Sequence, residues 1–207
     1  MFDNFTNVYY CIILSNGDCE MDEKVDLRII KTRTNLYQTL EDLLKSSSFE
    51  EIKVSDICSH ALINRSTFYA HYNDKYELLS DYIENRKNML AKELEKNSSI
   101  KNTKEYYLEL IKLLLDYMDD KKDVYLKIMI NNKNSITMDI IYDAVSKDII
   151  KHINSETTNG KVPSEIISHF YIGAVFNVCV EWLSYSNKYS KDDIISYIDA
   201  LIPNDLF

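Results

Sequence analysis

Hydrophobic residues recur along most of the chain at intervals of three and four, the spacing of one face of an α-helix. The first such stripe ends near the serines at positions 46–48 and consists of Leu36, Tyr37, Leu40, Leu43 and Leu44. A second, short helix is predicted over residues 54–60. Asn64 is a residue type favoured at helix N-caps and predicts a third short helix through about residue 72. Asn73 and Asp74 predict the start of a longer fourth helix.

The second half of the chain continues the helical pattern after a polar stretch at residues 96–102. Further helices are predicted at about 103–119, 121–131, 135–152, 163–186 and 191–201. Pro163, followed by a serine and a glutamate, is typical of a helix start. From Ile166 to Leu183 the sequence is apolar nearly all round. Such a helix must be covered on most sides, inside a bundle or at a subunit interface.

Composition supports a fold built from helices alone. The 207 residues include only three glycines and two prolines, which sheets and phosphate-binding loops need at their turns. We therefore predict an all-α protein with an N-terminal tri-helical helix-turn-helix head over residues 21–80. A C-terminal helical bundle over residues 81–207 is expected to serve dimerisation and ligand binding.

Residues 1–20 fit no helical pattern, and Met21 stands just ahead of the first helix. We expect a disordered extension, or a true start at Met21. The apolar run at 8–14 is too short to span a membrane, and no other run approaches about 20 apolar residues. The acidic start lacks the basic flank of a signal peptide. These features predict a cytoplasmic protein without a membrane partner.

Residues that carry catalytic or metal chemistry are scattered. Cys11, Cys19, Cys58 and Cys179 show no CxxC spacing, and the four histidines fall on separate predicted helices. There is no nucleophile elbow, Gly-rich loop or convincing carboxylate pair. We predict no enzyme, no cofactor and no metal. Cys58 and Cys179 are interpreted as small buried hydrophobes, with redox sensing as the alternative.

The net charge of −9 is unevenly distributed. From Lys24 to Lys75 there are eight lysines and arginines against seven acidic residues, a net of +1, so the rest of the chain carries −10. A segment at +1 cannot hold DNA by bulk attraction. Its few cations would have to be placed well to bind phosphates.

The predicted third helix separates into two faces. Phe68 and Tyr72, four residues apart, should face a core together with Ile63. The outward positions carry side chains suited to base edges, because Arg pairs with guanine, hydroxyls are adaptable and an Ala methyl can touch a thymine methyl. They are Arg65, Ser66, Thr67, Tyr69 and Ala70. His71, Lys75 and Ser55 are candidates to hold phosphates, with the N-termini of the second and fourth helices.

The stretch from Phe49 to Leu79 resembles the DNA-binding head of the tetracycline-repressor (TetR) family. The specific block is Thr67-Phe68-Tyr69-x-His71-Tyr72, followed by Asp74-Lys75 and Leu78-Leu79. The resemblance implies base contacts from the five outward residues of the third helix and phosphate contacts from Ser55, His71 and Lys75. Lys31 or Arg33 would add a further contact. Leu62 and Ser48 stand where the family often has Gly, and we expect the turn at Leu62 to adjust rather than keep a positive φ.

The resemblance also implies a homodimer and a ligand pocket in the C-terminal bundle. The helix at 163–186 and the last helix are the interface candidates, with burial inside one subunit as the alternative. A small apolar or aromatic effector would contact Tyr107, Leu110, Tyr125, Met129, Tyr142 and Phe170. Each of these could instead be plain core. His169, within the apolar helix, is expected to be a satisfied core or interface residue.

Together these features predict a DNA-binding transcriptional regulator, a ligand-responsive repressor that acts as a homodimer on a palindromic operator. The alternative is a DNA-bound scaffold or activator controlled by a partner protein. The fourth helix is the only strong candidate for a rigid link between the head and the bundle.

Overall fold

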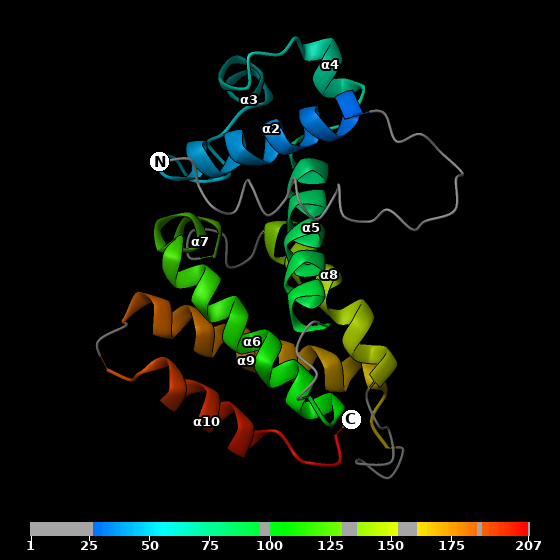
Figure 1. Cartoon of the computed structure of the whole chain (residues 1–207), viewed down its shortest axis with the longest axis vertical. Helices are drawn as coiled ribbons and strands as arrows, with labels where there is room; N and C mark the ends of the chain where they lie inside the picture. Colours follow the sequence, from blue (N-terminus) through cyan, green and yellow to red (C-terminus); the bar gives the residue numbers. More distant parts are fainter. Residues whose placement is uncertain (1–26, 96–99, 130–135, 153–160, 186–187, 207) are drawn as a thin grey trace. The chain divides into compact units, whose positions relative to one another are not determined.

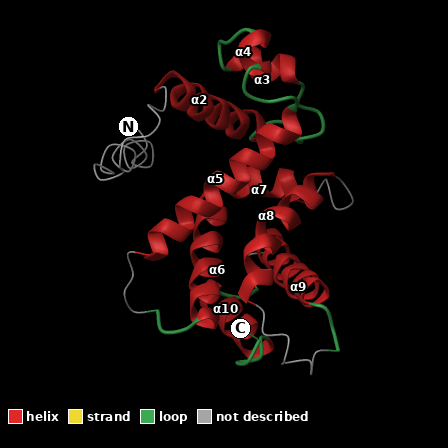
Figure 2. Ribbon diagram, turned by 90° about the vertical axis from the view of Figure 1, so that its right-hand side faces the viewer, coloured by secondary structure: helices red, strands yellow, loops and turns green. Residues whose placement is uncertain are grey.

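The computed structural model describes residues 27–95, 100–129, 136–152, 161–185 and 188–206. All regular secondary structure in these ranges is helical (Figures 1 and 2). The helices are α2 (Leu27–Leu44), α3 (Val54–His60), α4 (Arg65–Tyr69), α5 (Lys75–Glu95), α6 (Thr103–Asp120), α7 (Lys122–Met129), α8 (Ile136–His152), α9 (Ser164–Ser184) and α10 (Lys191–Leu201). The all-α prediction is confirmed. The predicted extension at 1–20 lies outside the described residues.

The chain divides into two compact units, residues 1–34 and 35–207. The described part of the first unit is the N-terminal half of α2. There Thr32 and Thr34 each donate a side-chain hydrogen bond to the carbonyl four residues earlier, at 2.8 and 3.0 Å.

The second unit begins with the C-terminal half of α2, which carries the apolar stripe predicted from the sequence. Leu36, Leu40 and Leu44 are fully buried in a core with α3, α4 and α5. The side chain of Asn35 donates to the carbonyl of Ala61 at 2.8 Å and so fastens α2 to the end of α3. These contacts make residues 35–79 a three-helix cluster closed by α5, which we call the reading head.

Helix α3 has the predicted bounds, but α4 ends at Tyr69, three residues before its predicted end. After Ala70 the chain turns, because the backbone N–H groups of His71 and Tyr72 both donate to the carbonyl of Phe68 at 2.9 and 3.0 Å. The carboxylate of Asp74 then accepts hydrogen bonds from two N–H groups in the first turn of α5. This cap sets the start of α5 one residue after Asp74.

Leu62, in the turn between α3 and α4, has a φ of 55° and is the only non-glycine residue with positive φ among those described. The expectation that this turn would adjust is therefore wrong. The backbone N–H of Ile63 donates to the carbonyl of Cys58 at 3.1 Å, which holds the turn in its left-handed form. Because the Leu62 side chain is 91% exposed, burial of that side chain does not offset the strain.

Replacing Leu62 with glycine is expected to raise the free energy of unfolding by roughly 0.5–1 kcal/mol. The left-handed region costs an L-residue about 1–2 kcal/mol, and glycine returns part of that gain as unfolded-state entropy. Urea unfolding of the two proteins measures the difference. Ser48→Gly is the matched control, because Ser48 has no positive φ and its backbone N–H and hydroxyl both donate to Glu51. Ser48→Gly should lower the free energy of unfolding. A lowered free energy of unfolding in Leu62→Gly would contradict backbone strain at Leu62.

The second unit contains two hydrophobic cores, and α7 contributes to both. Val124 and Ile128 are buried in the core of the reading head. Tyr125, between them in sequence, is buried in the core formed by α6, α9 and α10. Since successive residues of a helix point about 100° apart, one short helix can present a face to each core. The fourth predicted helix, now α5, is therefore not the only link between the reading head and the bundle.

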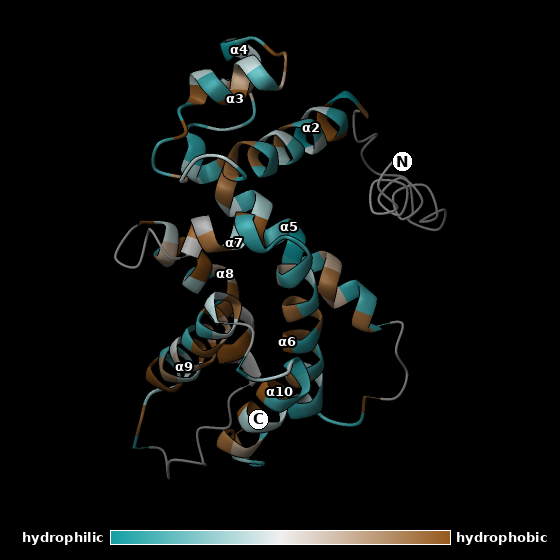
Figure 3. Cartoon of the chain, turned by 90° about the vertical axis from the view of Figure 1, so that its left-hand side faces the viewer, coloured by the Kyte–Doolittle hydropathy of each residue, from teal (hydrophilic) through white to brown (hydrophobic). Residues whose placement is uncertain are grey.

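Helix α9 contains mostly hydrophobic residues (Figure 3). By length and composition it is the one helix in the described ranges that could cross a membrane. Within its most apolar 18 residues, 39% are buried inside the protein. The prediction that no apolar run approaches membrane-spanning length is therefore wrong for α9. Leu183 and Cys179 face the bundle core, whereas Ile166 and Phe170 are 56% and 68% exposed.

Cys58 and Cys179 are both free and buried, as predicted. Burial raises the pKa of both thiols, that of Cys179 to about 12. A thiol held protonated in apolar surroundings is a poor nucleophile, which favours the interpretation as small hydrophobes over redox sensing. Cys11 and Cys19 lie outside the described residues.

Candidate nucleic-acid interface

Helix α4 separates into the two faces that its sequence predicts. Phe68 is fully buried and Tyr72, just beyond the helix, is 5% exposed, both within the core of the reading head. Arg65, Ser66 and Tyr69 are exposed, Tyr69 at 54%. Ala70 is exposed as well, and Thr67 is half-buried. The five predicted base-reading residues thus lie on α4 or directly after it, and four of them face solvent.

The orientation of α4 is fixed by contacts of its buried face. The ring of Phe68 packs edge-on against Tyr69 and tilted against Tyr72, with centroid distances of 5.6 and 5.9 Å. The hydroxyls of Tyr72 and of Tyr37 on α2 both donate to the carboxylate of Asp81 on α5, each at 2.6 Å. The carboxylate of Asp81 therefore positions both α2 and the segment after α4.

The residues predicted to contact phosphates differ in how far they are exposed. Ser55 is half-buried in the first turn of α3, and its hydroxyl lies 3.3 Å from the carboxylate of Asp56. His71 is half-buried with its ring 6.2 Å from that of Tyr72. In the first unit, Lys31 is exposed and Arg33 half-buried on α2.

The side chain of Lys75 is bound within the reading head. Its ammonium group donates to the carbonyls of Phe49, Glu50 and Ile52 at 2.9, 2.9 and 3.0 Å. An ammonium has three N–H donors, so these bonds use all of them. The group also lies 4.8 Å from the centre of the Phe49 ring. Burial lowers the pKa of Lys75, and the carboxylate of Glu50 opposes that change.

In this structure Lys75 therefore holds the turn between α2 and α3 against the start of α5, and its phosphate role stays a prediction. The sequence could not distinguish the two roles, because the three acceptors are backbone carbonyls some 25 residues away. The predictions for Arg65, Ser66, Thr67, Tyr69, Ala70, Ser55, His71, Lys31 and Arg33 stay predictions.

Sequence reasoning missed three polar residues that build the head: Asn35, Glu41 and Asp81. Glu41 is 2% exposed on α2 although it is an acid in an otherwise amphipathic helix. The signal was present, because Glu41 lies four residues after Tyr37 and one after Leu40, within the buried stripe. Its partners come from distant segments, however, and no local pattern names them.

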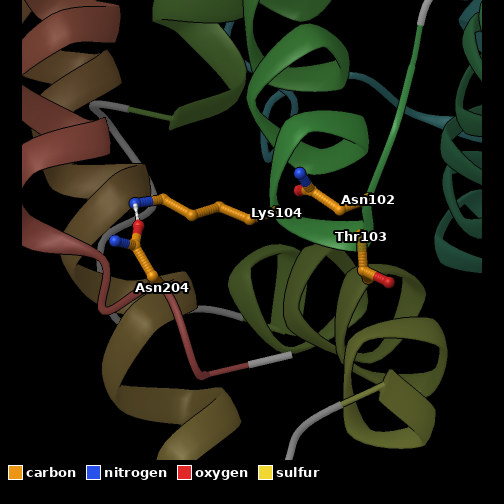
Figure 4. Close-up of a pocket in the computed structure, with 4 residues that line it drawn as sticks. All are labelled: Asn102, Thr103, Lys104 and Asn204. Atoms are coloured by element: carbon orange, nitrogen blue, oxygen red, sulfur yellow. Dashed lines mark hydrogen bonds between the residues drawn. The ribbon is translucent and has the colours of Figure 1, made fainter.

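The cavity found among the described residues is not lined by the predicted effector residues. A cavity of about 270 Å³ in the bundle is lined by Asn102, Thr103, Lys104 and Asn204, none of which was predicted (Figure 4). The ammonium of Lys104 donates to the side-chain oxygen of Asn204 at 2.8 Å and to the carbonyl of Ile202 at 2.7 Å. This lysine therefore joins the start of α6 to the chain after α10.

The six predicted pocket residues range from buried to exposed. Tyr107 and Tyr125 are buried, and Leu110 and Tyr142 are half-buried. Phe170 lies on the surface of α9 with 68% of it exposed, so it is not enclosed in a pocket within this subunit. The side chain of Met129 is outside the described residues. His169 is exposed, with its ring 6.3 Å from that of Tyr142.

A three-helix head in which two short helices, α3 and α4, are joined by a tight turn defines the helix-turn-helix class. Comparison with known proteins agrees. A family model described as the C-terminal region of transcriptional regulators, of the TetR type, matches residues 105–204. The transcriptional activator DhaS of the dhaKLM operon in Lactococcus lactis is 36% identical over 108 residues, 51% of this chain and 52% of that relative. The matched part therefore spans about half of the relative's length.

Solved structures extend the likeness over most of the chain. A TetR transcriptional regulator from Streptococcus agalactiae is 20% identical, with a TM-score of 0.62 over 86% of this chain and 97% of that one. A dihydroxyacetone kinase operon activator, also named DhaS, is 27% identical, with a TM-score of 0.51 over 83% and 94%. The C-terminal half of the chain thus matches a TetR-type family model, its fold is that of TetR regulators, and both agree with the resemblance of its reading head to that family.

Proposed function

We propose that this chain regulates transcription as a cytoplasmic homodimer that binds a palindromic DNA operator through α4. The observation that carries the proposal is the outward face of α4, where Arg65, Ser66 and Tyr69 are exposed while Phe68 anchors the opposite face. A helix held in this way can enter a major groove with its N-terminal residues toward the base edges.

Each exposed residue suits a specific contact. The guanidinium of Arg65 can donate two hydrogen bonds to one guanine, which discriminates bases by about 1–3 kcal/mol. The hydroxyl of Ser66 can bond bases or phosphates, and the methyl of Ala70 can contact a thymine methyl. The net charge of only +1 over residues 24–75 requires that specificity come from such contacts rather than from charge alone.

A second copy of the chain is the proposed partner of α9 and α10. Ile166 and Phe170 on α9, and Tyr197 and Leu201 on α10, are large apolar side chains exposed by 48–73%. Two copies paired through these helices would form a four-helix seam. The two reading heads would then meet half-sites roughly 34–36 Å apart, or a multiple of that.

The regulatory sign and the signal are further parts of the proposal. A repressor would release DNA when a small apolar or aromatic effector binds the bundle. The name of the Lactococcus relative favours the second candidate, an activator. In this candidate a partner protein, instead of a small molecule, binds the bundle and controls it. A reporter gene behind the chain's own upstream DNA separates them, because deleting the protein raises expression for a repressor and abolishes it for an activator.

The proposal is tested by salt-titrated binding of the purified chain to DNA from upstream of its own gene. Arg65→Ala and Tyr69→Ala are each expected to weaken binding about 5- to 150-fold, the equivalent of 1–3 kcal/mol. Lys92→Ala, an exposed lysine on α5, serves as the control and should bind like the wild type. If wild type does not bind at low salt, or both head variants bind normally, α4 is not the reading element.

A further inference from the structure

Glu41 is a buried carboxylate in the reading head whose four donors come from three other segments. It accepts hydrogen bonds from the Tyr82 hydroxyl at 2.8 Å and from Arg86 at 2.9 Å, both on α5. It also accepts from the Tyr117 hydroxyl on α6 at 3.3 Å, and it pairs with the ammonium of Lys121. We call these five residues the Glu41 cluster.

The two cations of the cluster lie against its aromatic rings as well as against the carboxylate. The guanidinium of Arg86 lies 5.1 Å from the ring centre of Tyr82 and 5.6 Å from that of Tyr117, and Lys121 lies 5.3 Å from the latter. Burial by itself raises the pKa of Glu41, but the charge of Arg86 and the bond from Lys121 outweigh it and leave the pKa lowered. The carboxylate is therefore charged and holds two cations.

Lys121 connects the cluster to the part of the chain where the two cores meet. It is the single residue between α6 and α7, and its backbone carbonyl accepts from the N–H groups of Val124 and Tyr125, at 3.0 and 3.2 Å, in the first turn of α7. Val124 enters the core of the reading head and Tyr125 enters the core of the bundle. A movement of the α6–α7 junction must therefore either carry the reading head with it or break the pair between Lys121 and Glu41.

A second polar contact among the described residues joins the reading head to the bundle near this junction. The hydroxyl of Thr137, fully buried in the first turn of α8, donates to the carboxylate of Glu50 at 3.3 Å. Glu50 also accepts from the hydroxyl of Tyr76 at 2.8 Å. This contact is a single bond to an exposed acid, whereas the buried Glu41 accepts two bonds from the α6–α7 side, from Tyr117 and Lys121. The larger share of the directional restraint thus lies with Glu41.

Hydrophobic residues of the same size could fill this space at equal or greater stability, because buried ion pairs cost desolvation. What a carboxylate with four fixed donors adds is geometry. We propose that the Glu41 cluster sets the orientation of the reading head relative to the α6–α7 junction, and that a signal at this junction reaches the DNA-binding surface by opening the Lys121–Glu41 pair. The inference rests on the proposed function, since it concerns how two heads engage one operator.

The test uses the full-length chain and two duplexes obtained by selection from a random library. One carries the complete operator, and the other has one half-site scrambled. Wild type should prefer the complete operator. Lys121→Met should lower that preference by about 2- to 30-fold, the range of coupling changes caused by residues that touch neither ligand, with half-site binding unchanged within about twofold. Lys121→Arg, which keeps the cation, should retain the preference, as should the exposed control Lys92→Met.

A general loss of structure would weaken both duplexes together, whereas loss of orientation weakens only the complete operator. Glu41→Gln keeps the side-chain shape and provides the second variant, and thermal unfolding shows that each variant is folded at the assay temperature. A Lys121→Met protein that is folded and keeps the full wild-type preference would overturn the inference alone. A wild type without preference for the complete operator would overturn the proposed function and the inference with it.

Discussion

Replacing Glu41 with alanine is expected to lower the free energy of unfolding by about 3–5 kcal/mol, the cost of breaking a buried ion pair by removing one partner. The substitution leaves the guanidinium of Arg86 and the ammonium of Lys121 without their shared carboxylate. It also removes the acceptor of the buried Tyr82 hydroxyl. Urea unfolding at pH 7 measures the change. Asp42→Ala, the exposed acid next to Glu41, is the control and should change stability by less than about 1 kcal/mol.

The same carboxylate gives a pH dependence whose sign follows from its lowered pKa. A group with a depressed pKa in the folded state stabilises the fold at pH values above its ordinary pKa, here 4.5. That contribution is lost as the pH falls below 4.5 and through the folded-state pKa. The stability difference between wild type and Glu41→Gln should therefore shrink on acidification. A difference that stays constant from pH 7 to pH 3 would contradict the charged form of Glu41.

The second large effect is expected from Phe68→Ala, which should cost about 3–5 kcal/mol and abolish DNA binding. Phe68 is fully buried and is the only buried residue of the five-residue helix α4. Removing its ring leaves a cavity beneath a helix too short to hold itself in place. Thermal unfolding and operator binding on the same samples measure both effects.

Tyr69→Ala is the matched control for Phe68→Ala, because the two aromatic residues are neighbours that face opposite ways. Tyr69 is 54% exposed, so its loss should change stability by less than about 1 kcal/mol while it still weakens DNA binding. A Tyr69 variant as unstable as the Phe68 variant would mean that the outward face of α4 is part of the core.

The local features of the head were predictable because they depend on spacing along one helix. Phe68 and Tyr72 lie inward as their separation of four residues requires, and α3 has the predicted bounds. The end of α4 at Tyr69 was not predictable from periodicity. It depends on the two bonds to the carbonyl of Phe68 and on the cap from Asp74, which compete with one further helical turn.

The features that sequence reasoning missed are those whose partners are distant in the chain. Lys75 was expected to reach phosphate, but three carbonyls at positions 49–52 take its donors. Glu41 was not singled out, because its partners lie 41–80 residues later. The expectation that Leu62 would avoid a positive φ failed for another reason. The hydrogen bonds of the turn outweigh a backbone strain of about 1–2 kcal/mol. The effector residues could not be separated from plain core, because aromatic residues at helical spacing serve both purposes.

The central claim, that α4 reads DNA bases, is tested most directly by selecting binding sites from random duplexes with wild type and with Arg65→Ala. Wild type should enrich a palindrome with two half-sites. Arg65→Ala should enrich the same palindrome with a relaxed guanine preference at one symmetry-related position in each half-site and no change elsewhere. Enrichment of no palindrome by wild type, or an identical preference at every position in the variant, would contradict the claim.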